Sequence, residues 1–128
     1  MIGLTSNKAA SHQVQCDYCA YVTHAGVLAV HESGVRSLKG ATTLKNGVFV
    51  EVSVNTAGKV EYRLDNELVY TSAAVVSKFP LYAAVNMNEQ GEKVTNFEWV
   101  LQPRNSGSKA WQILASMGGD GANGHFIV

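Results

Sequence analysis

Apolar and polar residues alternate along most of this chain, and helical periodicity is weak. The clearest example is the segment 48–54, where four valines alternate with Phe49, Glu51 and Ser53. Because successive side chains of a strand point to opposite faces, this pattern predicts a strand with one buried and one solvated face. The alternation returns at 59–64 and at 67–71, which predicts a three-stranded meander.

Turn-forming residues separate these segments. The first turn is predicted at 55–58, where Gly58 suits a positive φ, and a tight turn is predicted at Asp65–Asn66. Further alternation predicts strands at 19–23, 27–31, 81–87, 93–100 and 125–128, with turns at 24–26 and 89–92. The segment 111–117 also fits a short helix, but its length and the glycines after it favour a strand.

Many short strands with turns every 8–12 residues or so predict an all-β fold, a two-sheet antiparallel β-sandwich of jelly-roll type. The 128 residues suit a single domain. Within it we expect a main portion at 1–100, a Pro-, Ser- and Gly-containing linker at 101–110, and completing strands at 111–128.

The charge balance argues against a nucleic-acid-binding function. Ten Lys and Arg balance ten Asp and Glu, and the basic residues are dispersed. A nucleic-acid partner is therefore not expected, because binding to phosphates needs a basic patch. No apolar run approaches the ~18 residues of a membrane-spanning helix, and no signal peptide is visible.

Several phrases together resemble a known family. They are "MIGLTSN", "VHESG", "GVFVEVSVNTAGKVEYRLDNELVYTS" and "FPLYAAVNM". Over residues 1 to about 100 they resemble the concanavalin A-like jelly-roll module of bacterial surface and multidomain proteins. The pattern departs at His31, where the family has Tyr, and at Glu67, where it usually has Gly. The resemblance implies carbohydrate binding or adhesion, and an extracellular or surface-associated parent protein.

The family's first two strands have their counterpart at the end of this chain. Trp111, Ala115–Ser116, Gly119–Gly121 and His125–Val128 are similar to the family's opening "W-x-x-G-A-x-S…G-D-G-x-V-x-F". The resemblance therefore implies a circularly permuted domain, with a C-terminal extension as the alternative. We expect residues 126–128 and 1–4 to adjoin, in line or side by side. Split strands of this kind also predict a homo-oligomer through the terminal strands.

The pair Cys16 and Cys19 raises the question of a metal or redox site. Structural zinc needs four ligands, and the histidines (His12, His24, His31 and His125) show no ligand spacing. Residues three apart in a strand point to opposite faces, so we expect free thiols with Cys19 packed inside. A lone Asp120 between glycines is weak evidence for calcium. No cofactor or metal is expected.

Acidic residues raise the question of catalysis, because laminarinase-like glucanases share the jelly-roll fold. A retaining glycosidase needs two carboxyl groups about 5–5.5 Å apart. The turn at Asp65–Asn66 places Glu61 and Glu67 on adjacent strands with Arg63 between them, which favours a solvated face. We therefore expect no enzyme, and a glycoside hydrolase ranks last among the functions.

Aromatic residues provide the remaining candidates, since sugars stack on exposed rings. The rings are Tyr21, Tyr62, Tyr70, Tyr82, Trp99 and Trp111, all of which would also suit a sandwich core. With polar residues near turns, the predicted ligand-binding set is Tyr62, Asp65, Asn66, Tyr82, Asn86 and Trp99. The predicted function is a non-catalytic module that binds glycans or partner proteins. The alternative is an assembly module of a virion, filament or surface array.

Overall fold

Two antiparallel β-sheets make up the fold in a computed structural model of the chain. The structure describes residues 1–10, 15–22, 27–43, 48–87, 92–103, 109–119 and 125–127. Within these residues no helix is long and apolar enough to span a membrane. The expectation of an all-β chain with two antiparallel sheets is confirmed.

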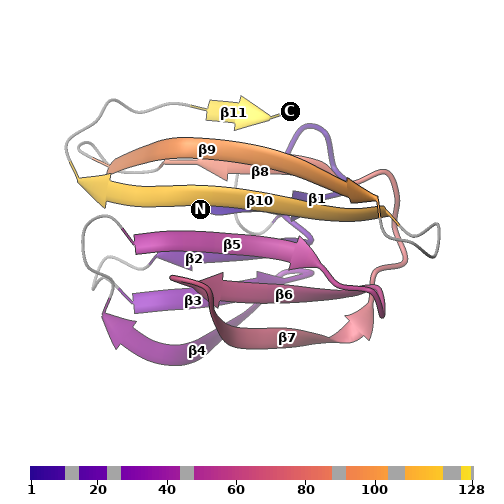
Figure 1. Ribbon diagram of the computed structural model, residues 1–128, viewed down its shortest axis with the longest axis horizontal. Coiled ribbons are helices and arrows are strands. Elements are labelled where there is room, and N and C mark those ends of the chain that lie inside the picture. Colours follow the sequence, from indigo (N-terminus) through magenta and orange to yellow (C-terminus); the bar gives the residue numbers. More distant parts are fainter. Residues whose placement is uncertain are drawn as a thin grey trace.

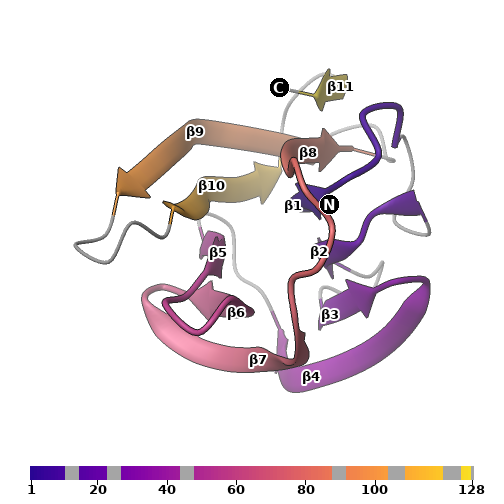
Figure 2. The same cartoon turned by 90° about the vertical axis from the view of Figure 1, so that its right-hand side faces the viewer.

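Each sheet combines strands from both halves of the chain (Figure 1). Among the described residues, sheet A has six strands in the order β11 (His125–Ile127), β8 (Tyr82–Asn86), β1 (Ile2–Thr5), β2 (Tyr18–Val22), β3 (Val27–Glu32) and β4 (Val35–Thr43). Sheet B, counted in the same way, has five, in the order β7 (Glu67–Val75), β6 (Lys59–Leu64), β5 (Val48–Val54), β10 (Lys109–Gly119) and β9 (Glu92–Pro103). Figure 2 shows the sheets as two layers, with β4 and β7 at the bottom.

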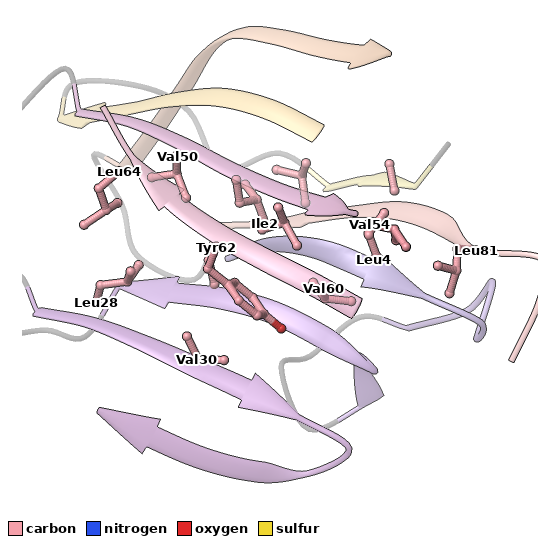
Figure 3. Close-up of a cluster of buried hydrophobic side chains, with 14 of the residues drawn as sticks. Ile2, Leu4, Leu28, Val30, Val50, Val54, Val60, Tyr62, Leu64 and Leu81 are labelled. Carbon is pink, nitrogen blue, oxygen red and sulfur yellow. The ribbon is translucent and has the colours of Figure 1, made fainter. Parts of the chain in front are cut away.

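The core lies between the two layers (Figure 3). Sheet B contributes every second residue of β5 and β6, and sheet A contributes the inward residues of β1, β3 and β8. These side chains include Ile2, Leu4, Leu28, Val30, Val50, Val52, Val60 and Tyr62, all fully buried. Removing such apolar surface from water provides the main driving force for packing the sheets together. The alternation in β5 and β6 therefore predicted the inner face correctly.

The meander β5–β6–β7 has the predicted turns. Gly58 has a φ of 75°, and its amide donates to the Asn55 carbonyl at 3.0 Å. Asp65 and Asn66 have φ values of 47° and 70°. Positive φ at both central positions is the geometry of the tight hairpin turns whose twist matches that of the flanking strands. Asp and Asn tolerate this region better than most residues, which explains their place here.

Some elements differ from the expectations. The alternation does not predict β4, because Arg36, Lys39 and Gly40 interrupt it. The linker expected at 101–110 is shorter, since β9 continues to Pro103 and β10 begins at Lys109. The segment 111–117 belongs to a strand, as expected. The turn predicted at 24–26, residues 89–91 of the turn predicted at 89–92, and Asp120 lie outside the described residues, while Glu92 begins β9.

The terminal strands do not adjoin, which corrects the expectation that they would lie in line or side by side. Ile2 of β1 and Phe126 of β11 are both register partners of Val85 in β8. The two strands therefore lie on opposite edges of β8 and run parallel to each other, so they do not form the continuous stretch that the permuted order implied. An interior strand offers backbone hydrogen-bonding groups on both edges, and here β1 takes one edge and β11 the other.

The expectation of free thiols is also wrong, because Cys16 and Cys19 form a disulfide. The argument from opposite strand faces assumed that both residues lie in a strand. Cys16 precedes β2, which begins at Tyr18, so its side chain is free to turn toward Cys19. The Cα–Cα distance of 6.0 Å is within the normal range for a disulfide. Cys19 is fully buried, as expected.

Candidate functional site

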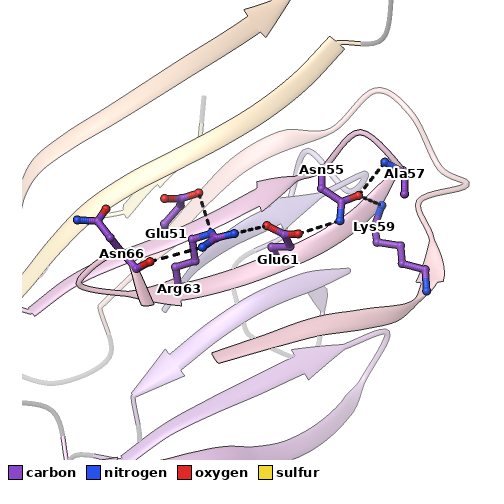
Figure 4. Close-up of polar contacts among 7 residues, drawn as sticks. All are labelled: Glu51, Asn55, Ala57, Lys59, Glu61, Arg63 and Asn66. Atoms are coloured by element: carbon purple, nitrogen blue, oxygen red, sulfur yellow. Dashed lines mark hydrogen bonds and ion pairs between the residues drawn. The ribbon is translucent and has the colours of Figure 1, made fainter. Parts of the chain in front are cut away.

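The outer face of sheet B carries a row of interacting polar side chains on β5 and β6. In this register Glu51 faces Arg63 and Ser53 faces Glu61. The inner positions of both strands are taken by valines, Tyr62 and Leu64, so the charged residues necessarily fall on the outer face. We call Glu51, Asn55, Glu61 and Arg63 the polar row (Figure 4).

Arg63 lies at the centre of the polar row and is shared by two carboxylates. One guanidinium nitrogen of Arg63 is 2.8 Å from Glu61 Oε2, and its Nε is 4.0 Å from Glu51 Oε1. The side chain of Glu51 is 9% exposed, against 31% for Arg63 and 19% for Glu61. The row is thus held close to the sheet yet remains in contact with solvent.

Both ends of the row are fixed by backbone contacts. Asn55 Nδ2 donates to Glu61 Oε1 at 2.9 Å, and Asn55 Oδ1 accepts from the amides of Ala57 and Lys59 at 3.0 Å each. At the other end Arg63 donates to the Asn66 carbonyl at 3.4 Å. Groups already held in place lose little further conformational freedom on binding a ligand, which favours affinity.

The polar row combines hydrogen-bond acceptors and donors. Its carboxylates accept hydrogen bonds, while its guanidinium and amide donate them. Two carboxylates and one guanidinium leave a formal excess of one negative charge. Charge-assisted hydrogen bonds of this kind are stronger than neutral ones. The row thus combines charged acceptors and donors on one face of the sheet.

The carboxylate pair considered from the sequence is not assembled. Glu61 is the register partner of Thr71, whereas Glu67 is the partner of Leu64 at the other end of the hairpin. Four residues along β7 separate Glu67 from Thr71, a distance of about 13 Å at the rise of a strand. This separation far exceeds the spacing of a retaining glycosidase pair.

Two of the predicted ligand-binding residues lie next to the polar row. Asp65 and Asn66 form the exposed β6–β7 turn, and the Asn66 carbonyl contacts Arg63. The carboxylate of Asp65 accepts from the Phe49 amide at 3.0 Å, and the Asp65 amide donates back to the Phe49 carbonyl at 2.8 Å. These bonds hold the turn against β5.

Tyr62 belongs to the core and cannot provide an exposed stacking surface. It is fully buried, its ring stacks on Tyr70 with 5.9 Å between centroids, and its hydroxyl donates to Glu32 at 3.1 Å. Burial, together with the Glu32 carboxylate, raises the pKa of the Tyr62 phenol far above its usual range. This residue therefore connects the two sheets.

The other predicted residues lie elsewhere. Tyr82 and Asn86 belong to β8 of sheet A; Asn86 is 3% exposed, and Tyr82 is half-buried with the Lys8 ammonium 6.0 Å from its ring centre. Trp99 lies in β9 as the partner of Ile113, and its side chain is outside the described part of the structure. The predicted set is thus divided between the two sheets and does not form one surface.

None of the four members of the polar row was predicted as a ligand-binding residue, and Glu61 was considered only for catalysis and assigned to a solvated face. For two of them the sequence does carry a signal, which is alternation. Glu51 lies between two valines, and Arg63 lies between Tyr62 and Leu64. The turn at 55–58 fixes the register of the β5–β6 hairpin, and this register places Glu51 opposite Arg63. Comparison with family models, curated proteins and solved structures finds no match to this chain.

Proposed function

We propose that the chain is a non-catalytic binding module that holds a glycan on the outer face of sheet B. The observation that carries the proposal is the polar row, in which Arg63 and Asn55 fix Glu61 between them. Sugar hydroxyls both donate and accept, so a fixed row of acceptors and donors suits them. The turn at Asp65–Asn66 extends this surface with further polar groups.

We also propose that the fold is a concanavalin A-like jelly roll. The two antiparallel sheets, which enclose one apolar core, support it. The phrases at residues 1–100 that resemble the family support the same fold, and with it a glycan ligand.

The test is a glycan array with the intact chain, followed by calorimetric titration of any glycan that binds. Glu61→Gln removes one charged acceptor and keeps the side-chain shape. A hydrogen bond to a charged group contributes about 1.5–3 kcal/mol, so binding should weaken by about tenfold or more. Glu67→Gln makes the same chemical change at an exposed position away from the row, and should change affinity by less than about twofold.

Two results contradict the proposal. One is the absence of binding across the array by a chain that is folded according to its circular dichroism. The other is a bound glycan whose affinity falls no further in Glu61→Gln than in Glu67→Gln. Binding of that glycan would not depend on the polar row. Binding lost only in Glu61→Gln supports it.

Assembly is the second candidate, favoured by exposed apolar side chains on edge strands. Leu68 and Val75 on β7 are 46% and 55% exposed, and Val35 on β4 is 69% exposed. Exposed apolar residues along sheet edges favour association with other chains. Light scattering over a range of concentrations tests this candidate, and a monomer at every concentration counts against it. The terminal strands remain a further route to an oligomer, since β11 is an edge strand.

A further inference from the structure

A buried histidine lies on the outer face of sheet A, the face away from the core. His31 is 6% exposed and belongs to β3, whose preceding residue Val30 is part of the core. The ring of Tyr21 on β2 meets the His31 ring edge-on, with 5.7 Å between centroids. Cys19, the register partner of His31, is joined to Cys16 and lies in a buried cluster against which Tyr21 also packs. The imidazole therefore lies among apolar and aromatic groups.

The imidazole of His31 has no polar contact to hold a charge. Neither of its ring nitrogens has a hydrogen-bond partner within the described part of the chain. Burial without a partner disfavours the charged form of a titratable group much more than the neutral form. Accordingly burial, and secondarily the charge of Arg36, lowers the pKa of the His31 imidazole. The folded chain thus keeps this side chain neutral.

The charged groups around His31 act in the same direction. Strand register places Arg36 of β4 directly opposite His31. Like charges directly opposed across a strand pair are destabilising, so a protonated His31 would repel Arg36. On the other side, β2 presents the Tyr21 ring and the disulfide-bonded Cys19, neither of which supplies a negative charge. Glu32, the next residue of β3, is bonded to sheet B across the core.

The strand that can yield to such repulsion is β4. It is the last strand in the order of sheet A, whereas β2, on the other side of β3, lies between two strands and carries the disulfide. The first residues of β4, Val35 and Arg36, are exposed. A segment with few buried contacts opens at a lower free energy than an interior strand does. Opening of β4 would admit water to the His31 ring.

We propose that His31 is an acid-sensitive clasp between β3 and β4. Near neutral pH the uncharged imidazole stays buried and the two strands stay paired. As the pH falls below about 6.5, where a solvated histidine ordinarily takes up a proton, the charged imidazole is stabilised by contact with water. Acid therefore favours the state in which β4 has separated from β3, while sheet B stays intact.

The size of the effect follows from proton binding. A histidine that takes up no proton while the site is closed, and has a pKa of about 6.5 when it is open, favours opening about tenfold more at about pH 5.5 than at about pH 7.5. Carboxylates ordinarily titrate near pH 4, so they stay charged over this range. The carboxylates therefore do not contribute to the response.

Hydrogen exchange followed by mass spectrometry tests the clasp on the intact chain, with rates corrected for the pH dependence of unprotected amides. From pH 7.5 to pH 5.5, peptides that cover β4 should lose protection by about tenfold, and those that cover β5 and β6 should keep theirs. His31→Phe keeps a ring against Tyr21 but takes up no proton, so it should remove the response. Arg36→Gln should leave a smaller response, because burial still disfavours the charged imidazole.

The matched pair of variants is His31→Gln and His125→Gln, which make the same change on β3 and on β11 at the other edge of sheet A. The first should abolish the response and the second should leave it unchanged. The proposal is overturned if β4 loses less than about twofold in protection, or if β5 and β6 lose as much as β4. A full response in a folded His31→Phe or His31→Gln chain also overturns it, as does loss of the response in His125→Gln.

Discussion

The hydrogen bond between Tyr62 and Glu32 connects the two sheets, and its removal should destabilise the fold measurably. Tyr62 lies on β6 of sheet B and Glu32 at the end of β3 in sheet A. The substitution Tyr62→Phe removes only the hydroxyl, while the ring stays buried and stacked on Tyr70. The loss can therefore be assigned to the 3.1 Å hydrogen bond.

Hydrogen bonds to charged groups contribute about 1.5–3 kcal/mol. Glu32 is half-buried, so water can replace part of the lost interaction. We therefore expect Tyr62→Phe to lower the free energy of unfolding by about 1.5–2 kcal/mol. Urea unfolding followed by circular dichroism measures this change, which should lower the midpoint and leave the slope unaltered.

A double-mutant cycle with Glu32→Gln separates this bond from other effects. Residues in direct contact usually show coupling energies of about 0.5–3 kcal/mol, so the double variant should lose less than the sum of the single variants. A loss below about 0.5 kcal/mol in Tyr62→Phe would refute the reasoning, since that is the size of a neutral surface change. Strict additivity in the cycle would refute it as well.

The pH dependence gives an independent check. The fold raises the pKa of the Tyr62 phenol, because burial and then Glu32 disfavour the phenolate. The stabilisation is complete below the ordinary value of about 10 and is lost as the pH rises above it. The free-energy difference between the unaltered chain and Tyr62→Phe should therefore shrink above about pH 10, and a constant difference would contradict the assignment.

Two further substitutions test the packing of the sheets. Gly3→Ala should lower the free energy of unfolding by about 1–3 kcal/mol, because the new Cβ collides with Cys19 and with the backbone of Tyr18. Gly34→Ala is the matched control: its φ of 83° is strained for alanine but no atom lies within 4 Å, so it should cost about 1 kcal/mol, and an equal loss would refute the steric argument. Ser72→Ala should cost about 1–3 kcal/mol in thermal or urea unfolding, since the buried hydroxyl accepts from Val60 at 2.9 Å and donates to the Ala74 carbonyl, also at 2.9 Å. An effect below about 0.5 kcal/mol would show that water replaces this hydroxyl.

The meander was predictable because its signals are local. Alternation in β5 and β6 decides which face is buried, and the residues Asp65–Asn66 and Gly58 mark the turns. β4 was not predictable in this way. Two basic residues and a glycine interrupt its alternation, and pairing with β3 makes it a strand. The disulfide was missed for a related reason, because its geometry depends on where β2 begins.

The candidate site could be predicted only in part. Asp65 and Asn66 were identified from turn propensity and do lie beside the polar row. Tyr62 was assigned to the ligand because aromatic residues suit sugars and cores equally, and only its burial distinguishes the two. The pairing of Glu51 with Arg63 depends on register, which the turn at 55–58 could have indicated.

By itself, the sequence determined the all-β class, the meander and its buried face, since side-chain alternation and turn propensity act over a few residues. Only the tertiary structure decided that β8 separates β1 from β11, that Tyr62 bonds to Glu32, and that His31 lies beside Cys19. These relations join segments far apart in the chain. They depend on which strand edges meet and which faces are covered, and no local pattern encodes that choice.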